Sequence, residues 1–376
     1  MKLLVVAPYY APKIGGLENY ARQLGIALRD IKKWEVVVVT SNYLGRKSII
    51  DVVDAMKIYR LGTLCKLSNT PINPFWPFAI RRIIRKERPD FILAHTPVPS
   101  MADASALAAG RTPFILAYHA ATLQKGDSPL FNLVAQVYGW YETITLRRAA
   151  RILAVSDFVK ATFPAKLQHK VRVLPNAVWA RDVQQRAQPE QIEFLFIGSL
   201  DRTHAWKGLE DILRALAVYQ REFTAPFVLS VMGDGNDRPR YERLAAALGL
   251  QDCVQFLGAQ TGAEKEATIR RATALVMYPT TANDAFPTVM LEAWARYVPV
   301  VAAAIGPIPS LIHDGIDGLL VPPHQPGELA HALHTVASSS RAARAHMAQA
   351  AAQRVHDAYT WERQAAALAE IVKELL

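Results

Sequence analysis

The 376-residue sequence contains only two cysteines and no long apolar run. Cys65 and Cys253 lie far apart and outside any metal-ligand spacing, which excludes a disulfide framework and a cysteine zinc site and favours a reducing compartment. No apolar stretch reaches the ~20 residues that a helix needs to span a bilayer. The opening residues MKLLVVAPYYAP have the length of a strand rather than of a cleaved signal peptide. We therefore expect a cytoplasmic protein whose contact with a membrane is at most peripheral.

Several catalytic motifs are also missing. The sequence has no Gly-x-Ser-x-Gly elbow, no phosphate-loop signature, no His-Glu-x-x-His zinc helix and no Asp-x-Asp pair for a nucleotide-bound metal. Cations, by contrast, are in surplus: 43 Lys and Arg against 33 Asp and Glu give a net charge of +10. This surplus favours an anionic partner, such as a nucleotide phosphate, a nucleic acid or an acidic membrane surface.

Short apolar runs alternate with helical patterns in both halves of the chain, on either side of a polar segment at 180–191. Runs of Val, Ile and Leu separated by helices predict parallel sheets that are covered on both faces. The fold class is therefore α/β, with two Rossmann-like doubly wound domains that face a central cleft. The expected strands are 2–8, 34–41, 91–96, 113–119, 151–156 and 171–176 in the first half, and 193–200, 227–235, 254–258, 274–279 and 299–306 in the second.

Two glycines follow the first expected strand. Gly15 and Gly16 allow the backbone to approach a ligand, and the helix that begins there offers N–H groups and a positive dipole end to an anion. Glu18 lies in the first turn of this helix. The alternative is a tight strand-to-helix turn in which Glu18 only compensates the helix dipole.

A second strand end carries two cations. Gly198 ends the strand, and Arg202 and Lys207 lie before the next helix. Arginine binds a diphosphate bidentately and lysine binds it as a point charge, so this loop is a candidate diphosphate site. The alternative is a solvated charged loop.

The segment NDAFPTVMLEAWARYVP, residues 283–299, contains two carboxylates. Asp284 lies in a strand-to-helix loop, Pro287 suits the first turn of the helix, and Glu292 lies just over one turn into it. The two carboxylates therefore do not share one helix face. The alternative to a functional pair is an N-cap carboxylate and one ordinary polar helix position.

Two histidines, His95 and His119, stand at the carboxyl ends of expected strands. Functional groups gather at this edge of parallel sheets. The alternative for each is a satisfied surface histidine.

In the segment 75–88, the residues FAIRRIIRKER (78–88) predict a basic amphipathic helix, and Phe75 and Trp76 lie adjacent to it. Apolar Phe78, Ile80, Ile83 and Ile84 alternate there with five basic residues. Such a helix can lie in a membrane interface and bind anionic lipid, which gives the hypothesis of peripheral contact with the inner face of a membrane. The alternative is a helix that covers the sheet and exposes a solvated basic face.

Taken together, these segments resemble the retaining family 4 glycosyltransferases, which have the GT-B architecture. The stretch DAFPTVMLEAWARYVPVVAAAIGPIPSLIHDGIDGLLVPP is similar to the donor-binding signature of that family. GGLENYARQL, AYH, ILAVSDFVK, VLPNAV, FIGSLDRTHAWKGLEDIL, VMGDG, VQFLG and YTWERQ extend the resemblance over nearly the whole chain. It implies an acceptor-side domain at 1–180, a nucleotide-sugar-binding domain at 181–357, and a C-terminal helix at about 358–376 that packs back on the first domain.

The resemblance implies a retaining hexosyltransferase with no metal and no cofactor. The donor would be a nucleoside diphosphate sugar such as GDP-mannose or UDP-glucose. The acceptor would be a glycan, glycolipid or lipid-linked hydroxyl in envelope or polysaccharide biosynthesis. Arg202 and Lys207 would neutralise the diphosphate leaving group. The other implied contacts are Asp284 and His119 with the transferred sugar, Glu292 with the ribose, Gly15, Gly16, Gly198, Phe286, Pro287, Thr288 and Val289 with the rest of the donor, and Glu18 and His95 on the acceptor side.

Some positions depart from the family pattern. Asp284 replaces the usual Glu, Pro287 replaces a Gly and removes a backbone donor, and Ser199 and Ser310 stand where the family prefers charged residues. These changes leave the sugar and the base open. Two other functions are a sugar-nucleotide epimerase of similar fold, against which LEAWA and YTWERQ argue, and a non-catalytic nucleotide-sugar- or RNA-binding protein. Because no RNA-binding motif is present, we expect no nucleic-acid partner.

Overall fold

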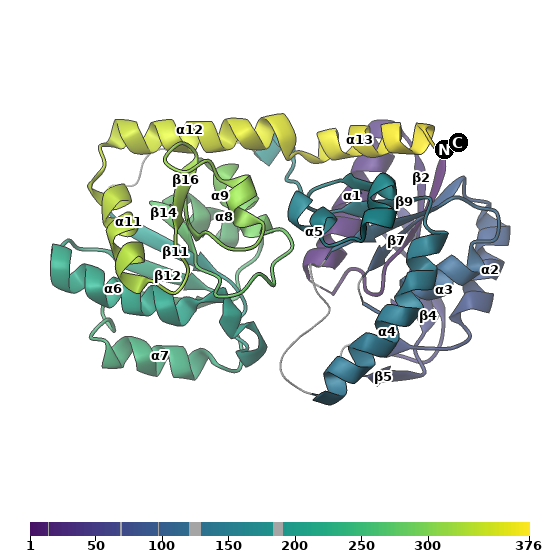
Figure 1. Cartoon of the computed structure of the whole chain (residues 1–376), viewed down its shortest axis with the longest axis horizontal. Coiled ribbons are helices and arrows are strands. Elements are labelled where there is room, and N and C mark those ends of the chain that lie inside the picture. The colour runs from purple at the N-terminus through teal and green to yellow at the C-terminus, as the bar shows by residue number, and fades with distance from the viewer. Residues whose placement is uncertain (14, 68–69, 97, 120–128, 183–190) are drawn as a thin grey trace. The chain divides into compact units, whose positions relative to one another are not determined.

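The computed structural model describes residues 1–13, 15–67, 70–96, 98–119, 129–182 and 191–376. These residues form two compact units (Figure 1). Unit 1 comprises Met1–Asn176 and Trp361–Leu376, and unit 2 comprises Ala177–Thr360. Within the described ranges, no helix is both long enough and apolar enough to cross a membrane.

Unit 1 contains an eight-stranded sheet with the order β10-β9-β8-β7-β1-β2-β4-β3. Neighbouring strands run parallel, except that β3 pairs antiparallel with β4. The central strands β7 and β8 are buried along their whole length, as expected for strands covered on both faces. The strands are β1 (Lys2–Val6), β2 (Glu35–Asn42), β3 (Ile49–Val53), β4 (Met56–Gly62), β7 (Phe91–Thr96), β8 (Phe114–Tyr118), β9 (Arg151–Ala154) and β10 (Val171–Val173).

Helices cover both faces of this sheet (Figure 1). On one face, α1 (Gly16–Lys32) packs against α13 (Trp361–Lys373). On the other face, α2 (Trp76–Glu87), α3 (Met101–Ala108) and α4 (Pro129–Arg148) pack side by side. The short helix α5 (Asp157–Ala161) lies between β9 and β10 in the chain.

The sequence does not predict β3, β4 or the small antiparallel sheet of β5 (Cys65–Leu67) and β6 (Thr70–Ile72). Charged residues interrupt the apolar pattern of β4. Arg60 of β4 is buried, pairs with Asp51 of β3 at 3.0 Å and donates a hydrogen bond to the carbonyl of Ala11. An ion pair within the sheet therefore replaces the apolar alternation on which a strand prediction relies.

The amphipathic helix α2 packs its tryptophan and its isoleucines inward. Trp76, Ile80, Ile83 and Ile84 are all buried. The isoleucines therefore cover the sheet, as the alternative to a membrane helix expects. The face that remains exposed carries two aromatic residues and five cations: Phe75, Phe78, Arg81, Arg82, Arg85, Lys86 and Arg88.

The last residue of α2, Glu87, ties the helix to the sheet through a buried carboxylate. It accepts hydrogen bonds from Lys2 at 2.8 Å, from Lys57 at 2.7 Å and from the Tyr59 hydroxyl. Burial alone would raise the pKa of the Glu87 carboxyl, but these three donors outweigh burial and lower the pKa to about 2.

We expect Glu87→Gln to destabilise the protein by about 1–3 kcal/mol at pH 7, because the lysines lose the carboxylate that they share. The folded pKa lies below the unfolded value of 4.5, so the wild-type contribution is complete above pH 4.5 and is lost as the pH falls towards about 2. Urea unfolding followed by circular dichroism at several pH values measures this. The variant should lose less stability than the wild type on acidification. Glu328→Gln, at an exposed carboxylate, is the control.

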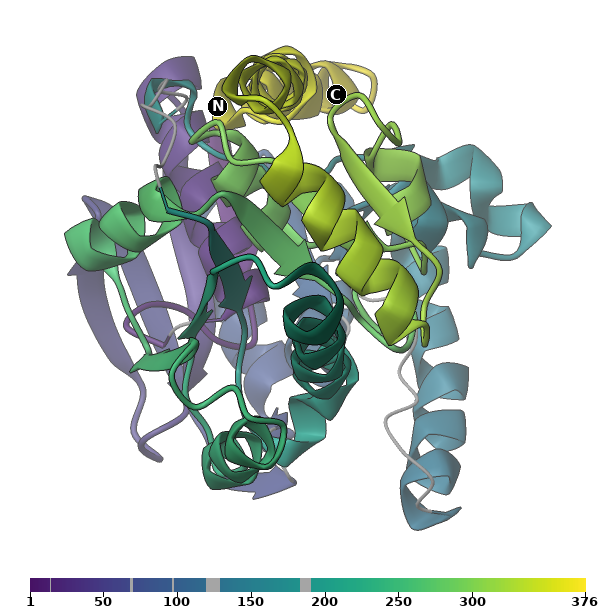
Figure 2. The same ribbon diagram turned by 90° about the vertical axis from the view of Figure 1, so that its left-hand side faces the viewer.

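Unit 2 contains a six-stranded parallel sheet with the order β13-β12-β11-β14-β15-β16. On one face, α6 (Leu209–Phe223) lies beside both α7 (Arg238–Ala247) and α11 (Pro326–Ser338) (Figures 1 and 2). On the other face, α9 (Thr288–Trp294) lies beside α8 (Gly262–Arg271) and α12 (Arg341–Ala358). The strands are β11 (Glu193–Ile197), β12 (Val228–Met232), β13 (Val254–Gly258), β14 (Ala274–Met277), β15 (Val300–Ala303) and β16 (Gly318–Val321).

Both units have the doubly wound α/β fold that the sequence predicts. In each sheet, the direction of strand addition reverses beside the first strand of the unit: between β1 and β7 in unit 1, and between β11 and β14 in unit 2. Ligands of open α/β sheets bind beyond the carboxyl ends of the strands at such a switch point. Two clusters of predicted site residues lie at these two places.

Candidate active site

In unit 2, Lys207 lies across Gly198 at the end of β11. Lys207 ends a short 3-10 helix, η3 (Arg202–Lys207), that follows the strand. A side-chain Cβ on Gly198 would stand 2.8 Å from Cδ of Lys207, so the aliphatic part of the lysine packs directly on the glycine backbone. The ammonium group then lies 5.0 Å from the ring centroid of Trp206. The glycine at the strand end therefore determines where the cation is held.

Backbone contacts fix η3 against the segment that follows β14. The N–H of Thr280 donates to the carbonyl of Trp206 at 2.8 Å. Gly208, directly after η3, has a φ of +76°, and a Cβ there would collide with the carbonyl oxygen of Tyr278. Two loops from adjacent strands are therefore locked together, and they bring Lys207 near Asp284. Gly208 is not among the predicted site residues, although a glycine before a helix is a signal for such a turn.

Asp284 is influenced by both burial and a cation. Burial raises the pKa of its carboxyl group, and the positive charge of Lys207 and the N–H of Phe286 limit that rise. Its Oδ1 accepts a hydrogen bond from Phe286 N at 3.2 Å. The N-cap of α9 is Pro287, which offers no side-chain cap, so Asp284 does not act as the helix cap that the alternative interpretation supposes.

The predicted donor-binding residues Phe286, Pro287, Thr288 and Val289 form the entry into α9. Phe286 and Pro287 are buried, and the Phe286 ring lies 5.7 Å from that of Tyr359, between centroids. Thr288 and Val289 are half-buried and make up the first helical positions. The backbone of this turn directly follows Asp284, and the contact between Phe286 and Tyr359 packs it within unit 2.

Glu292 belongs to a charge network between α8 and α9. Lys265 of α8 contacts the Glu292 carboxylate at 2.7 Å. Arg296 donates to the backbone carbonyl of Glu292 at 3.1 Å and pairs with Glu266, which also pairs with Arg270 at 2.7 Å. Lys265 is not among the predicted site residues, because an ion pair between two helices is not visible in local spacing.

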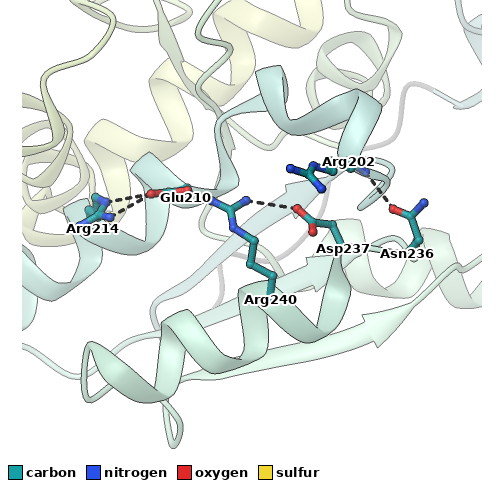
Figure 3. Close-up of polar contacts among 6 residues, drawn as sticks. All are labelled: Arg202, Glu210, Arg214, Asn236, Asp237 and Arg240. Carbon is teal, nitrogen blue, oxygen red and sulfur yellow. Dashed lines mark hydrogen bonds and ion pairs between the residues drawn. The ribbon is translucent and has the colours of Figure 1, made fainter.

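Arg202 stands apart from the surrounding ion pairs (Figure 3). Its backbone N–H donates to Oδ1 of Asn236 at 3.0 Å, while its exposed guanidinium makes no ion pair with any described residue. The neighbouring network joins Glu210 to both Arg214 and Arg240, and Arg240 to Asp237. Of the three arginines drawn, Arg202 is therefore the one whose guanidinium forms no ion pair with the other residues drawn.

At the switch point of unit 1, α1 begins at Gly16 with Gly15 as its N-cap. The carboxyl group of Glu18 lies over Gly15, where a Cβ would collide with it. Gly16 is exposed, and a Cβ there would meet no atom within 4 Å, so the contacts of unit 1 do not require a glycine at this position.

The two predicted histidines contact each other. His95, within β7, is completely buried, and His119 follows β8 and is half-buried. Nδ1 of His95 lies 2.9 Å from Nε2 of His119. Tyr20 of α1 packs edge-on against both rings. The predicted site residues of unit 1 therefore divide into a glycine turn and a histidine pair.

Described side chains show no group of three or more His, Cys, Asp and Glu that could hold a metal ion. Among the predicted site residues of unit 2, the cations are Arg202 and Lys207, for which the sequence predicts contact with a diphosphate. Both are side chains of η3.

The chain is similar to known glycosyltransferases. Residues 14–179 match the family model "Glycosyltransferase Family 4", and residues 179–354 match "Glycosyl transferases group 1". A D-inositol 3-phosphate glycosyltransferase from Salinispora arenicola is 34% identical over 187 residues, which cover 48% of this chain and 40% of that protein. The chain thus spans less than half the length of this curated relative.

Solved structures share the fold over the whole chain. HepE from Anabaena, in complex with UDP, has a TM-score of 0.77 at 18% identity and is covered completely, as is this chain. Sucrose-phosphate synthase from Thermosynechococcus elongatus has a TM-score of 0.76 at 20% identity, with 100% of this chain and 99% of that chain covered. At these identities the likeness concerns the fold.

Proposed function

Because this chain belongs to the family 4 glycosyltransferases, of GT-B type, we propose that it moves a hexose of the mannose or glucose type from a nucleoside diphosphate sugar to an acceptor hydroxyl. The acceptor would be a glycan, a glycolipid or a lipid-linked sugar in envelope or polysaccharide biosynthesis. The observation that carries this proposal is the convergence of Gly198, Lys207 and Asp284 at the switch point of unit 2. A cation and a carboxyl group held there by two adjacent strands suit the two ends of a sugar–phosphate bond.

The diphosphate would be neutralised by Lys207 and Arg202. Lys207 is held in place by its packing on Gly198, whereas the Arg202 guanidinium is exposed and has no ion-pair partner among the described residues. The Lys207 ammonium would bind the leaving group as a fixed point charge, and the planar guanidinium of Arg202 would adjust to it and donate bidentate hydrogen bonds. These two cations do the work that a divalent ion does in other transferases, so we propose that transfer needs no metal.

The sugar and the ribose would be held by the two carboxylates of the segment 283–299. Asp284 lies in the loop beside Lys207 and would accept hydrogen bonds from hydroxyls of the transferred hexose. Glu292 lies on α9, where Lys265 holds it, and would accept hydrogen bonds from the ribose hydroxyls. Since the carboxylates grip different parts of one donor, neither has to act as a nucleophile.

We further propose that the configuration at the anomeric carbon is retained. The bond from that carbon to the leaving phosphate oxygen breaks, and the acceptor oxygen bonds to the same face of an oxocarbenium-like centre. The acceptor proton passes to the leaving diphosphate, whose negative charge Lys207 and Arg202 stabilise. His119 is assigned a contact with the transferred hexose during this step.

UDP-hexoses are the first donors to test, and GDP-mannose is the next. HepE, which shares the fold, is described in complexes with UDP and with UDP-glucose. Thermal-shift measurements with UDP, GDP and ADP identify the base, because a ligand that binds only the folded protein raises its Tm. Release of the nucleoside diphosphate from the matching sugar donors then tests turnover. A full panel of nucleotide sugars that gives neither binding nor turnover overturns the proposal.

Peripheral membrane contact is a separate part of the proposal. The exposed face of α2 places Phe75 and Phe78 beside five cations, a combination that suits anionic headgroups and the interface below them. Co-sedimentation with vesicles containing phosphatidylglycerol, compared with purely zwitterionic vesicles, tests this contact. Equal sedimentation with both vesicle types contradicts it.

A further inference from the structure

His95 and His119 form an imidazole pair inside unit 1. Their ring centroids lie 5.2 Å apart and the ring planes differ by 22°. His95 is completely buried, and its Nδ1 stands 2.9 Å from Nε2 of His119. A direct hydrogen bond between two imidazoles requires one ring to donate and the other to accept, so the proton positions of the two rings depend on each other.

The surroundings of both rings favour the neutral imidazole at pH 7. Burial lowers the pKa of His119 to about 3, and burial together with the neighbouring His119 lowers the pKa of His95 well below its ordinary value. A neutral imidazole carries one N–H and one unprotonated nitrogen. Only two arrangements of the pair are therefore open.

The second nitrogen of His95 distinguishes the two arrangements. Nε2 of His95 is buried and has no hydrogen-bond partner among the described residues. If His119 donated to His95, the proton of His95 would be on this Nε2, and a buried N–H would be unsatisfied. If His95 donates from Nδ1, Nε2 keeps only an unpaired acceptor. An orphaned buried N–H is the rarer and more costly state, so the second arrangement is favoured.

The surroundings hold the pair in place. The Tyr20 ring packs at 5.8 Å from His95 and at 4.6 Å from His119, between centroids, and its hydroxyl donates to the carbonyl of Leu174. The Trp361 ring also packs edge-on with Tyr20, at 5.3 Å between centroids. The backbone N–H of His119 donates to the carbonyl of Thr96, which follows His95. The two rings therefore meet in a fixed geometry.

We propose that His95 is a positioning residue, which donates its Nδ1–H to Nε2 of His119 and so fixes His119 in the tautomer that carries its proton on Nδ1. His119 then presents an N–H donor, and not an acceptor, to an oxygen of the transferred sugar. This assignment rests on the proposed function for the role of His119. It also gives His95, whose buried side chain does not reach the surface of unit 1, a route to influence transfer.

The tautomer is tested first, on the full chain without substrate. Nitrogen-15 chemical shifts of the His119 ring distinguish a proton on Nδ1 from a proton on Nε2. We expect the Nδ1–H form in the wild type. Mixed tautomers are expected in His95→Leu, which removes the donor. In His95→Asn the Nδ1–H form should return, because the side-chain amide can place an N–H where Nδ1 of histidine stands. An Nε2–H form of His119 in the wild type overturns the proposal.

Kinetics provide the second readout. We expect His95→Leu to lower kcat by about 10–100-fold with little change in the KM for the donor. An effect of this size is typical when a residue that orients a functional side chain through a hydrogen bond is removed. His95→Asn should recover most of the rate, whereas His95→Gln, whose amide lies one carbon further out, should not. Tyr20→Phe, which keeps the ring and loses the hydroxyl, controls for packing. Unchanged kcat in His95→Leu refutes the positioning role.

The two readouts separate this inference from the proposed function. If the protein transfers no sugar, the tautomer measurement still tests the hydrogen bond. If it transfers sugar but His95→Leu is fully active, the glycosyltransferase assignment stands and the role of His95 fails. Should His95→Leu not fold, the comparison of His95→Asn with His95→Gln decides the question, since both retain an amide of related chemistry.

Discussion

Replacing Lys207 with methionine should lower kcat by about 10²–10³-fold, the typical effect of losing one group that stabilises charge in a transition state. Methionine keeps an unbranched chain that can lie on Gly198, where Cδ of the lysine packs. The substitution therefore removes the charge and preserves the packing. We also expect some loss of stability at pH 7, because the Asp284 carboxylate loses the positive charge that favours its ionised form in the folded protein.

Comparison of several variants makes the Lys207 experiment specific. Lys207→Arg keeps the charge in another shape and should retain part of the activity, whereas Lys207→Ala should resemble Lys207→Met. Lys166→Ala, at an exposed lysine of unit 1, is the control and should be fully active. Release of nucleoside diphosphate from the sugar donor provides the measurement. Full activity in Lys207→Met would remove the electrostatic role from this residue.

The same variant should alter Asp284. Lys207 counteracts the rise in the Asp284 pKa that burial causes, so its removal should raise this pKa further. A carboxyl group that must be ionised to hold the sugar then works only at higher pH. The acidic limb of the kcat profile of Lys207→Met should therefore lie at higher pH than that of the wild type.

The second large effect is expected at Glu292. Glu292→Ala should weaken the binding of UDP, or of whichever nucleotide the screen identifies, by about 10–100-fold, because hydrogen bonds to a charged group contribute about 1.5–3 kcal/mol. The loss should concern only ligands that contain the ribose. Affinity for inorganic pyrophosphate should therefore be unchanged, which calorimetric titration can show for the same protein sample.

The network around Glu292 supplies matched controls. Lys265→Ala leaves the carboxylate in place but removes the contact that orients it, so we expect a smaller loss of nucleotide affinity. Glu266→Gln changes a carboxylate of the same network that pairs with Arg296 and Arg270 rather than with Lys265. Its nucleotide affinity should be close to that of the wild type. An unchanged Kd in Glu292→Ala contradicts the ribose assignment.

The pattern of apolar residues along the sequence predicts much of the fold. Strands that are covered on both faces must be apolar along their length, so β1, β7, β8, β11 and β14 stand out as runs of Val, Ile and Leu. Strands with mixed chemistry do not stand out. The edge pair β3–β4 is held partly by Arg60 and Asp51, which local patterns cannot connect.

The candidate site shows the same division. Parallel strands place their carboxyl ends at one edge, so residues that follow apolar runs, such as Gly198 and His119, are recognisable as candidates from their place in the chain. The pairing of these residues is not recognisable in that way. Whether Lys207 lies near Asp284, or His95 behind His119, depends on which strands are neighbours.

The sequence by itself therefore determined the fold class, the family and the set of residues to consider, because burial and strand ends leave local marks. Only the tertiary structure decided that the isoleucines of α2 face inward, that Lys265 holds Glu292, and that His95 is bonded to His119. These contacts join residues 24 or more positions apart, or depend on which face of a helix meets the sheet. Strand order and helix rotation settle them, and both are set by the packing of the whole unit.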